Sequence, residues 1–219
     1  MSNSKTAISK QINNIKQKSS PANSYVIKDM KQSHFEQILM IANRQLGQNY
    51  VTHQLLNDCI KKNTLFHGRT VIDTETKHIL GFCISIVIND VALSDMLNMD
   101  IEAIPCPLSA CDQLGVIKTI AIKHDQKGYG IGTHLILDAI HQLQQYSQMI
   151  ATIAWKTKYG INLHGVLMKT GFQRLFEIPH FWYQSSLETG CHCAVCGRPP
   201  CLCSAVIYIH QTKKVNPLN

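Results

Sequence analysis

The 219-residue sequence predicts one α/β sandwich built on a mixed central sheet, formed by residues 23–219. Strand-like and helix-like segments alternate in the order β-α-α-β-β-β-α-β-α-β-β, which is typical of a sheet packed against helices. The long apolar run 79–88 alternates between two faces as a central strand does. A second apolar run, 116–122, passes through a glycine-rich turn into a helix.

The first half of the chain supplies a strand, two helices and a hairpin. Ser33 is expected to cap the first helix, because Glu36 three residues later completes a capping box. Two prolines mark residues 89–111 as an irregular loop, which is suited to an acceptor site. The regular elements are expected at residues 25–28 (strand), 33–44 (helix), 51–62 (helix), 70–73 and 79–88 (hairpin).

The second half completes the sheet. Ile150 to Trp155 is a buried strand by its composition, and Gly171 is expected to end the helix that follows it. The remaining elements are expected at residues 116–122 (strand), 133–144 (helix), 161–170 (helix), and 181–183 with 205–209 (closing hairpin).

The glycine-rich turn predicts a binding site for a phosphorylated cofactor. Glycines at 128, 130 and 132 let backbone N–H groups converge, and the helix behind them adds a partial positive charge. The spacing G-x-G-x-G fits neither a dinucleotide fingerprint nor a Walker loop, since no acidic residue ends the next strand and no Lys precedes Thr133. A plain strand-to-helix turn is the alternative.

Two motifs together resemble the GCN5-related N-acetyltransferases. Lys127-x-x-Gly130-x-Gly132 is similar to the acyl-CoA loop of that family, with Lys in place of the usual Arg or Gln. About 20 residues further on, an Asn-containing helix ends in Gly171-Phe172, as it does in the family. The resemblance covers about residues 25–185. It implies an α/β sandwich whose fourth and fifth strands splay apart at the acyl-CoA loop.

The resemblance implies acetyl-CoA as cosubstrate and an amine as acceptor. It assigns the pantetheine arm to the fourth strand and the pyrophosphate to the loop. For Lys127 the alternative is a solvated loop lysine, and for Asn162 it is a helix N-cap. The cofactor-binding residues expected on this basis are Ile120, Ala121, Ile122, Lys127, Gly128, Tyr129, Gly130, Ile131, Gly132, Thr133 and Asn162.

The catalytic positions depart from the family pattern. Leu167 stands where the family's acidic Tyr is usual, so His164, one turn earlier, and Tyr159 are the candidates to protonate the leaving thiolate. Many relatives carry a Glu on the fourth strand, where this chain has Val116 to Thr119. Asp112 and Asp95 are the remaining candidates for the base. These departures keep a second hypothesis open, a catalytically silent acyl-CoA-binding or interaction module.

A cysteine cluster near the C-terminus predicts a metal site in an insertion, residues 190–204, before the last strand. Cys193-x-x-Cys196-Gly resembles half of a zinc knuckle, and Cys201-x-Cys203 can complete a tetrahedral site for a structural zinc. Cys191 or His192 replacing one ligand, and free or redox-labile thiols, are the alternatives. Such a metal would order a connection that lacks its own core.

Charge and composition limit the possible partners. The formal net charge of the chain is +7. The first 28 residues contain five lysines and no acid, so the rest of the chain has a net charge of only +2. A nucleic-acid-binding body would be basic, so nucleic acid is not expected as a partner. Residues 1–22 are predicted to be a mobile basic tail. We expect a cytoplasmic protein with no membrane contact, because nine cysteines accompany no secretory signal and no apolar run of spanning length.

Overall fold

The computed structural model describes residues 24–61 and 65–212, so the predicted tail, residues 1–22, lies outside the described residues. Its main sheet runs in the order β1-β3-β4-β5-β6-β10-β8, and every neighbouring pair is antiparallel except β5 and β6. The strands are β1 (Tyr25–Asp29), β3 (Phe66–Asp73), β4 (Ile79–Ile88), β5 (Leu114–Ile122), β6 (Met149–Thr157), β8 (Gln173–Ile178) and β10 (Ser204–Gln211).

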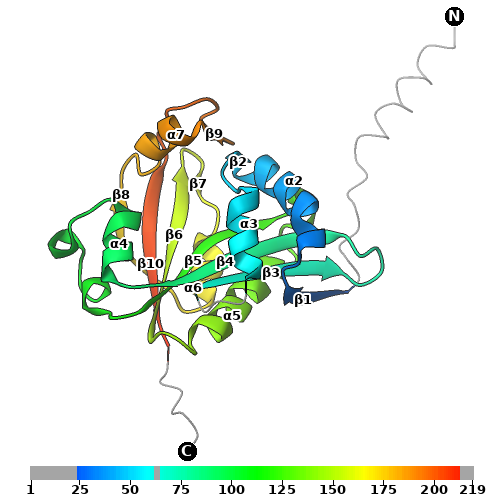
Figure 1. Cartoon of the computed structure of the whole chain (residues 1–219), viewed down its shortest axis with the longest axis horizontal. Coiled ribbons are helices and arrows are strands. Elements are labelled where there is room, and N and C mark those ends of the chain that lie inside the picture. The colour runs from blue at the N-terminus through cyan, green and yellow to red at the C-terminus, as the bar shows by residue number, and fades with distance from the viewer. Residues whose placement is uncertain (1–23, 62–64, 213–219) are drawn as a thin grey trace, which may run out of the picture.

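Helices cover both faces of the sheet, which confirms the predicted α/β sandwich. α2 (Phe35–Gln45), α3 (His53–Ile60) and α4 (Asp90–Leu97) lie on one face, which is toward the viewer in Figure 1. α5 (Ile131–Leu143) and α6 (His164–Lys169) pack on the opposite face. Alternation along each strand sends apolar side chains into both layers, and each fully buried Leu, Ile or Phe contributes about 1.5–3 kcal/mol.

Short elements complete the fold. β7 (Gly160–Ile161) pairs with the end of β6, and β2 (Gly47–Gln48) pairs with β9 (His192–Cys193). α7 (Tyr183–Thr189) lies between β8 and β9. None of the helices in the described part of the chain combines the length and the apolar character that crossing a bilayer would require. The 3-10 turns are η1 (Gln32–His34), η2 (Ile101–Ala103), η3 (Leu108–Ala110) and η4 (His124–Gln126).

Two expectations for the first half are wrong in detail. Ser33 lies inside η1 rather than at a helix N-cap, and α2 begins only at Phe35. Residues 89–111 are not irregular throughout, because Asn89 caps α4 by accepting a hydrogen bond from the Ala92 N–H (3.0 Å). Two helical turns show too few apolar repeats to reveal such a helix from the sequence.

One strand of each expected hairpin also differs from the prediction. β3 begins at Phe66, four residues earlier than expected, because Phe66 pairs with Ile86 of β4. Residues 181–183 are not a strand but lead into α7, and β10 pairs instead with β8. β8 carries Arg174 and Glu177, whose charges obscure the apolar pattern of an edge strand.

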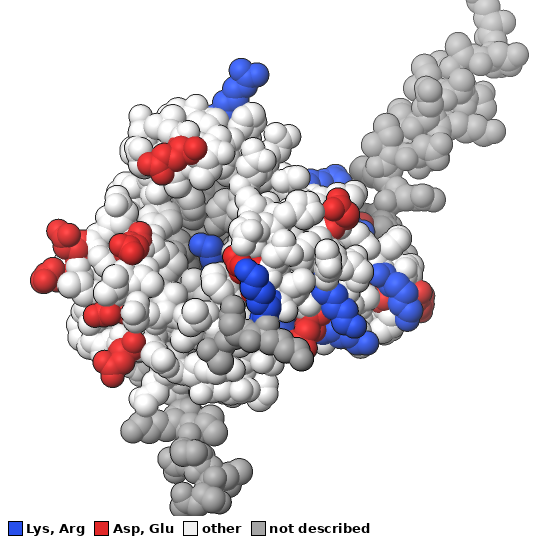
Figure 2. Space-filling view, in the orientation of Figure 1, with Lys and Arg blue, Asp and Glu red and all other residues white. Residues whose placement is uncertain are grey.

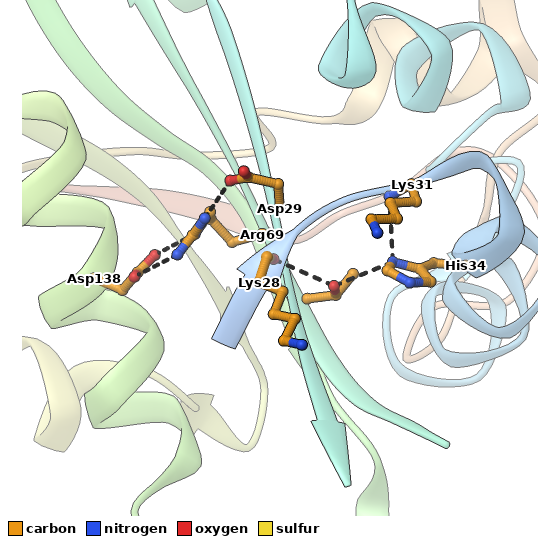
Figure 3. A network of polar contacts seen from close by, with 7 residues as sticks. Lys28, Asp29, Lys31, His34, Arg69 and Asp138 are labelled. Carbon is orange, nitrogen blue, oxygen red and sulfur yellow. Dashed lines mark hydrogen bonds and ion pairs between the residues drawn. The ribbon is translucent and has the colours of Figure 1, made fainter. Parts of the chain in front are cut away.

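An ion-pair network fixes α5 against the sheet, and α5 begins at the glycine-rich turn. Figure 3 shows Arg69 of β3 between Asp138 of α5 and Asp29 of β1. The Arg69 guanidinium donates to Asp138 through Nε (2.7 Å) and Nη2 (3.0 Å), a bidentate geometry that is stronger than a single contact. Both side chains are largely buried, with 15% and 18% exposed. Because the pair is partly desolvated, losing one partner leaves an uncompensated charge.

Replacing Arg69 with Met is therefore expected to lower the free energy of unfolding by about 1–3 kcal/mol. The measurement is urea denaturation of the wild type, Arg69→Met, Asp138→Asn and the double variant, which isolates the coupling between the two side chains. Lys61→Met, which removes the exposed pair with Asp58, is the control and should leave the unfolding midpoint almost unchanged. A coupling energy between Arg69 and Asp138 no larger than the roughly 0.2–1 kcal/mol typical of exposed pairs would contradict this role.

Candidate functional site

The sheet opens between β5 and β6. The two parallel strands pair only at Gly115 with Ile150, Val116 with Ala151 and Ile117 with Thr152. The Thr152 hydroxyl donates to the Ile117 carbonyl (3.0 Å) at the last of these pairs. β5 then continues to Ile122 paired with β4 alone, so among the described strands its other edge has no partner. A row of backbone groups in the middle of a sheet is left available to a ligand.

The glycine-rich turn follows β5. Gly128 and Gly130 have φ angles of +91° and +83°, and a Cβ on either would meet nothing within 4 Å, so the space beside them is open. Gly130 is the N-cap of α5, which makes Ile131, Gly132 and Thr133 its first turn. The N–H groups of a first turn have no acceptor inside the helix. Together with the helix dipole they form an anion-binding cradle.

α6 sits beside this opening and ends as the sequence predicts. The Phe172 N–H donates to the Leu167 carbonyl (3.0 Å) and the Gly171 N–H to the Met168 carbonyl (3.3 Å), which is a Schellman motif. Gly171 has φ +83°, the left-handed conformation that this motif needs. Leu167 is fully buried in the core. It therefore presents no polar group at the position where the family resemblance places a tyrosine.

His164 is held by a buried partner that the sequence did not reveal. Its Nδ1 lies 2.8 Å from the hydroxyl of Tyr208, a fully buried residue of β10. Burial raises the pKa of Tyr208, so its phenol stays protonated and can donate to Nδ1. The same hydroxyl can accept from Nδ1–H when the imidazole is protonated, because a phenol is both a donor and an acceptor. Tyr208 lies in an ordinary apolar strand pattern, and only the three-dimensional pairing identifies it.

The other two predicted side chains near α6 are exposed. Tyr159 is 79% exposed in the turn between β6 and β7, with Lys158 Nζ 5.1 Å from its ring centroid. Asn162 is also exposed, and it is not an N-cap, because Leu163 occupies that position in α6. The candidate bases are also exposed: Asp95 lies in α4, and Asp112 lies just before β5.

The four predicted metal ligands converge. The Sγ atoms of Cys193, Cys196, Cys201 and Cys203 all lie within 4.8 Å of one another, with 3.9 Å between Cys193 and Cys203 and 3.5 Å between Cys196 and Cys203. Ligands 2.3 Å from a tetrahedral zinc lie about 3.8 Å apart. Cys191 and His192 do not belong to this group. The arrangement can therefore hold a tetrahedral metal with four sulfur ligands.

The four thiols differ in the backbone groups that contact them and in the extent of their burial. The N–H groups of Val195 (3.4 Å) and Cys196 (3.3 Å) point at Cys193 Sγ, as in metal-binding knuckles. Burial raises the pKa of Cys203 to about 12 and also raises that of Cys201. Burial opposes ionisation of Cys196 as well, but hydrogen bonds from the Leu202 backbone and neighbouring thiols bring its pKa below the usual value. A bound cation would favour all four thiolates.

The cysteine segment is attached to the loop between α2 and α3. Gly47 pairs with Cys193 and Gln48 with His192, and the Ala194 N–H donates to the Leu46 carbonyl (3.2 Å). A Cβ at Gly47 would lie 1.9 Å from the His192 carbonyl oxygen, so only glycine permits this approach. On the opposite side, the Cys201 N–H donates to the buried Ser186 hydroxyl of α7 (2.9 Å). The segment thus links α7 to the α2–α3 loop.

These linked segments border a hollow in the face that carries α2, α3 and α4 (Figure 2). Tyr50, from the α2–α3 loop, lies against Thr119 of β5 and Trp182 beside α7. Burial raises the pKa of Tyr50, while its contacts with Thr119 and Trp182 oppose the shift. The opening between β5 and β6 therefore has the glycine cradle on one face of the sheet and this hollow on the other.

Solved structures with the same architecture identify the fold. Arabidopsis thaliana NAA60 in complex with a bisubstrate analogue superposes with a TM-score of 0.62 at 11% identity, covering 86% of this chain and 98% of that one. The Escherichia coli ribosomal-protein-S18-alanine N-acetyltransferase gives 0.57 at 12% identity, covering 90% and 99%. The NatC complex bound to Gag peptide and CoA gives 0.57 at 14% identity, covering 87% and 99%.

No protein-family model and no curated protein matches the sequence. The structural likeness nevertheless extends over nearly the whole of each compared chain and includes an acetyltransferase of the GNAT family. The chain therefore has the fold of the GCN5-related N-acetyltransferases, which confirms the fold predicted from the sequence.

Proposed function

We propose that this protein transfers an acetyl group from acetyl-CoA to an amine by direct attack on the thioester. The observation that carries the proposal is the opening between β5 and β6, directly followed by the glycine cradle at the start of α5. Structural neighbours support it, since one is Arabidopsis thaliana NAA60 in complex with acetyl-CoA, with a TM-score of 0.61. We place the reaction in the cytoplasm, because none of the nine cysteines forms a disulfide.

The residues at the opening fit the cofactor. The unpaired edge of β5 from Ile120 to Ile122 can pair with the amides of a pantetheine arm, as a further strand would. Lys127 lies exposed at the start of the turn, where its ammonium can reach a phosphate. Asn162, exposed before α6, can contact the arm from the other side. The N–H groups that would hold the pyrophosphate belong to Gly128, Tyr129, Gly130, Ile131, Gly132 and Thr133.

Acetyl-CoA supplies the activated acyl group, and the chain must supply proton transfer and orientation. His164 is our proposed acid, since its imidazolium can give the Nε2 proton to the leaving thiolate and end as a neutral imidazole, while the Tyr208 hydroxyl accepts from Nδ1–H and fixes the ring. Tyr159 is the second choice, because its exposure leaves its hydroxyl unfixed. Backbone N–H groups of β5 beyond Ile117 are available to polarise the thioester carbonyl.

One observation favours a second function, an acyl-CoA-binding module without catalysis. Leu167 places an apolar side chain in the core at the position where the resemblance expects the acid. Such a module would bind acetyl-CoA at the same cradle and use the cysteine segment as a docking surface. Binding and turnover measured side by side separate the two functions.

Titration calorimetry with acetyl-CoA tests the proposal. Gly130→Glu introduces a carboxylate into the cradle and should weaken binding about 100-fold, since two or so charge-assisted hydrogen bonds are lost. Leu137→Glu adds the same charge on the exposed side of α5 and should bind as the wild type does. His164→Gln should bind normally but lose turnover in an assay of free CoA thiol with a panel of amines.

Equal binding by Gly130→Glu and Leu137→Glu, or no binding by the folded wild type, would contradict the proposed site. Normal acetyl-CoA binding without turnover of any amine by the wild type would favour the silent module. Melting temperatures of all variants show whether a loss of binding reflects unfolding, because Gly130 has a positive φ that strains any other residue.

We also propose that Cys193, Cys196, Cys201 and Cys203 hold a structural zinc. The four sulfur atoms are close enough, two backbone N–H groups already point at Cys193, and Trp155, Trp182 and Val195 pack around the thiols. A metal there would stabilise residues 190–204, which we interpret as an insertion into a single domain formed by residues 23–219. Its role would be to hold the segment, and through β9 the α2–α3 loop, in place.

Elemental analysis of protein purified without chelator is expected to find about one zinc per chain. Cys203→Ser should lose the metal and lower the melting temperature, because three ligands hold a structural zinc weakly. Cys106→Ser is the matched control, since Cys106 is an exposed thiol outside the cluster. A metal-free wild type whose clustered thiols react freely with a thiol reagent would contradict the site.

A further inference from the structure

The bulge in β5 brings two polar side chains to the same face of the sheet. Ile84 of β4 pairs with Thr119 and Ser85 pairs with Ile117, so Lys118 is the extra residue in the ladder. Ile117 and Ile120 both pack toward α5 on the opposite face. Alternation on either side of the bulge then directs Lys118 and Thr119 toward the face that carries α2, α3 and α4.

This placement puts an ammonium and a hydroxyl on the face of the sheet that carries the hollow. Thr119 is 5% exposed, and its Oγ1 completes no hydrogen bond of normal geometry with any described residue. Tyr50 lies against Thr119 from the α2–α3 loop, and its hydroxyl is kept protonated by burial. Figure 2 shows the hollow on this face of the molecule. Lys118, Thr119 and Tyr50 can each donate a hydrogen bond, and the two β5 residues lie where β5 parts from β6.

The ammonium of Lys118 has no counter-ion in the described part of the chain. No described carboxylate lies within ion-pair distance of it, whereas Lys61 and Lys156 pair with Asp58 and Glu177. Partial burial lowers the pKa of Lys118, and burial is the only cause of that shift. A half-buried cation without a partner is costly, and an anion brought by a ligand would remove the cost.

We propose that Lys118 and Thr119 bind an anionic group of the acceptor, so that the acceptor is an amine that also carries a carboxylate. The proposal rests on the proposed function, which supplies an acceptor at this opening. One ammonium and one hydroxyl match a singly charged carboxylate, which can accept both hydrogen bonds at once. The carboxylate comes from a free amino acid or from an acidic side chain near the start of a peptide.

Calorimetry with product analogues tests this without requiring turnover. CoA-loaded protein is titrated with two pairs of compounds, and the members of each pair differ in one carboxylate. The first pair is N-acetylalanine and its amide. The second pair is the α-amide of N-acetylaspartate and the α-amide of N-acetylasparagine. In at least one pair, the compound with the carboxylate is expected to bind about tenfold more tightly than its neutral partner, because it gains one charge-assisted hydrogen bond. The first pair reports an amino acid as the source and the second reports a peptide side chain.

Three variants identify the group responsible. Lys118→Met should abolish the preference for the carboxylate and leave binding of the neutral partner unchanged. Lys118→Arg should keep the preference, because it keeps the charge. Lys61→Met, which removes an exposed lysine at the end of α3, should behave as the wild type does.

Two outcomes would overturn the inference. No preference for the carboxylate in either pair removes the anion site, and a preference that survives in Lys118→Met assigns it elsewhere. If Lys118→Met instead slows acidic and neutral amines equally and shifts the pH profile of turnover, Lys118 is a base and not an anion site. Failure of the proposed function is distinguishable, because the wild type would then not bind CoA in the first titration.

Discussion

The parting of β5 from β6 is the constraint on which the rest of the structure depends. A sheet normally satisfies the backbone groups of its interior strands. Here three residue pairs join the two central strands, and β5 continues with no partner on that side among the strands that the structure describes. Unpaired backbone groups in a sheet interior are unfavourable unless another molecule or water satisfies them. An extended cofactor arm with amide groups is a partner of the right chemistry for that edge.

The neighbouring elements hold this opening in a defined shape. On one face, Arg69 fixes α5 through Asp138, and α5 presents its first turn at the end of β5. On the other face, the cysteine segment joins α7 to the α2–α3 loop through β9 and β2. A metal bound by the four thiols would thus stabilise the border of the hollow without contacting the cofactor. Under this proposal, cofactor binding and acceptor binding respond to different parts of the chain.

Much of this arrangement is predictable from the sequence because it depends on local patterns. Glycines at 128 and 130, a glycine at the end of α6 and paired Cys-x-x-Cys and Cys-x-Cys motifs each impose a conformation on their own neighbourhood. Tertiary pairings are different. Tyr208 contacts His164 across 44 positions of sequence, and β2 meets β9 over an even longer separation. No spacing rule links such residues.

The sequence predictions that are wrong lie where the local sequence pattern is weak or is common to more than one kind of structure. Ser33 precedes an acidic residue at capping-box spacing, but a 3-10 turn occupies that position. α4 is only two turns long, and its N-cap Asn89 resembles any loop asparagine. β8 is an edge strand whose Arg174 and Glu177 hide its alternation. The bulge at Lys118 is likewise invisible in sequence, because it depends on the register with β4.

Hydrogen–deuterium exchange with and without acetyl-CoA tests the central claim most directly. If the cofactor completes the edge of β5, the amides of residues 118–122 that face the opening and those of residues 128–133 should exchange at least about tenfold more slowly in its presence, as newly bonded amides do. The β3–β4 hairpin, already paired, should not change. Protection confined to other segments, or none at saturating acetyl-CoA, would contradict the view that this opening is the cofactor site.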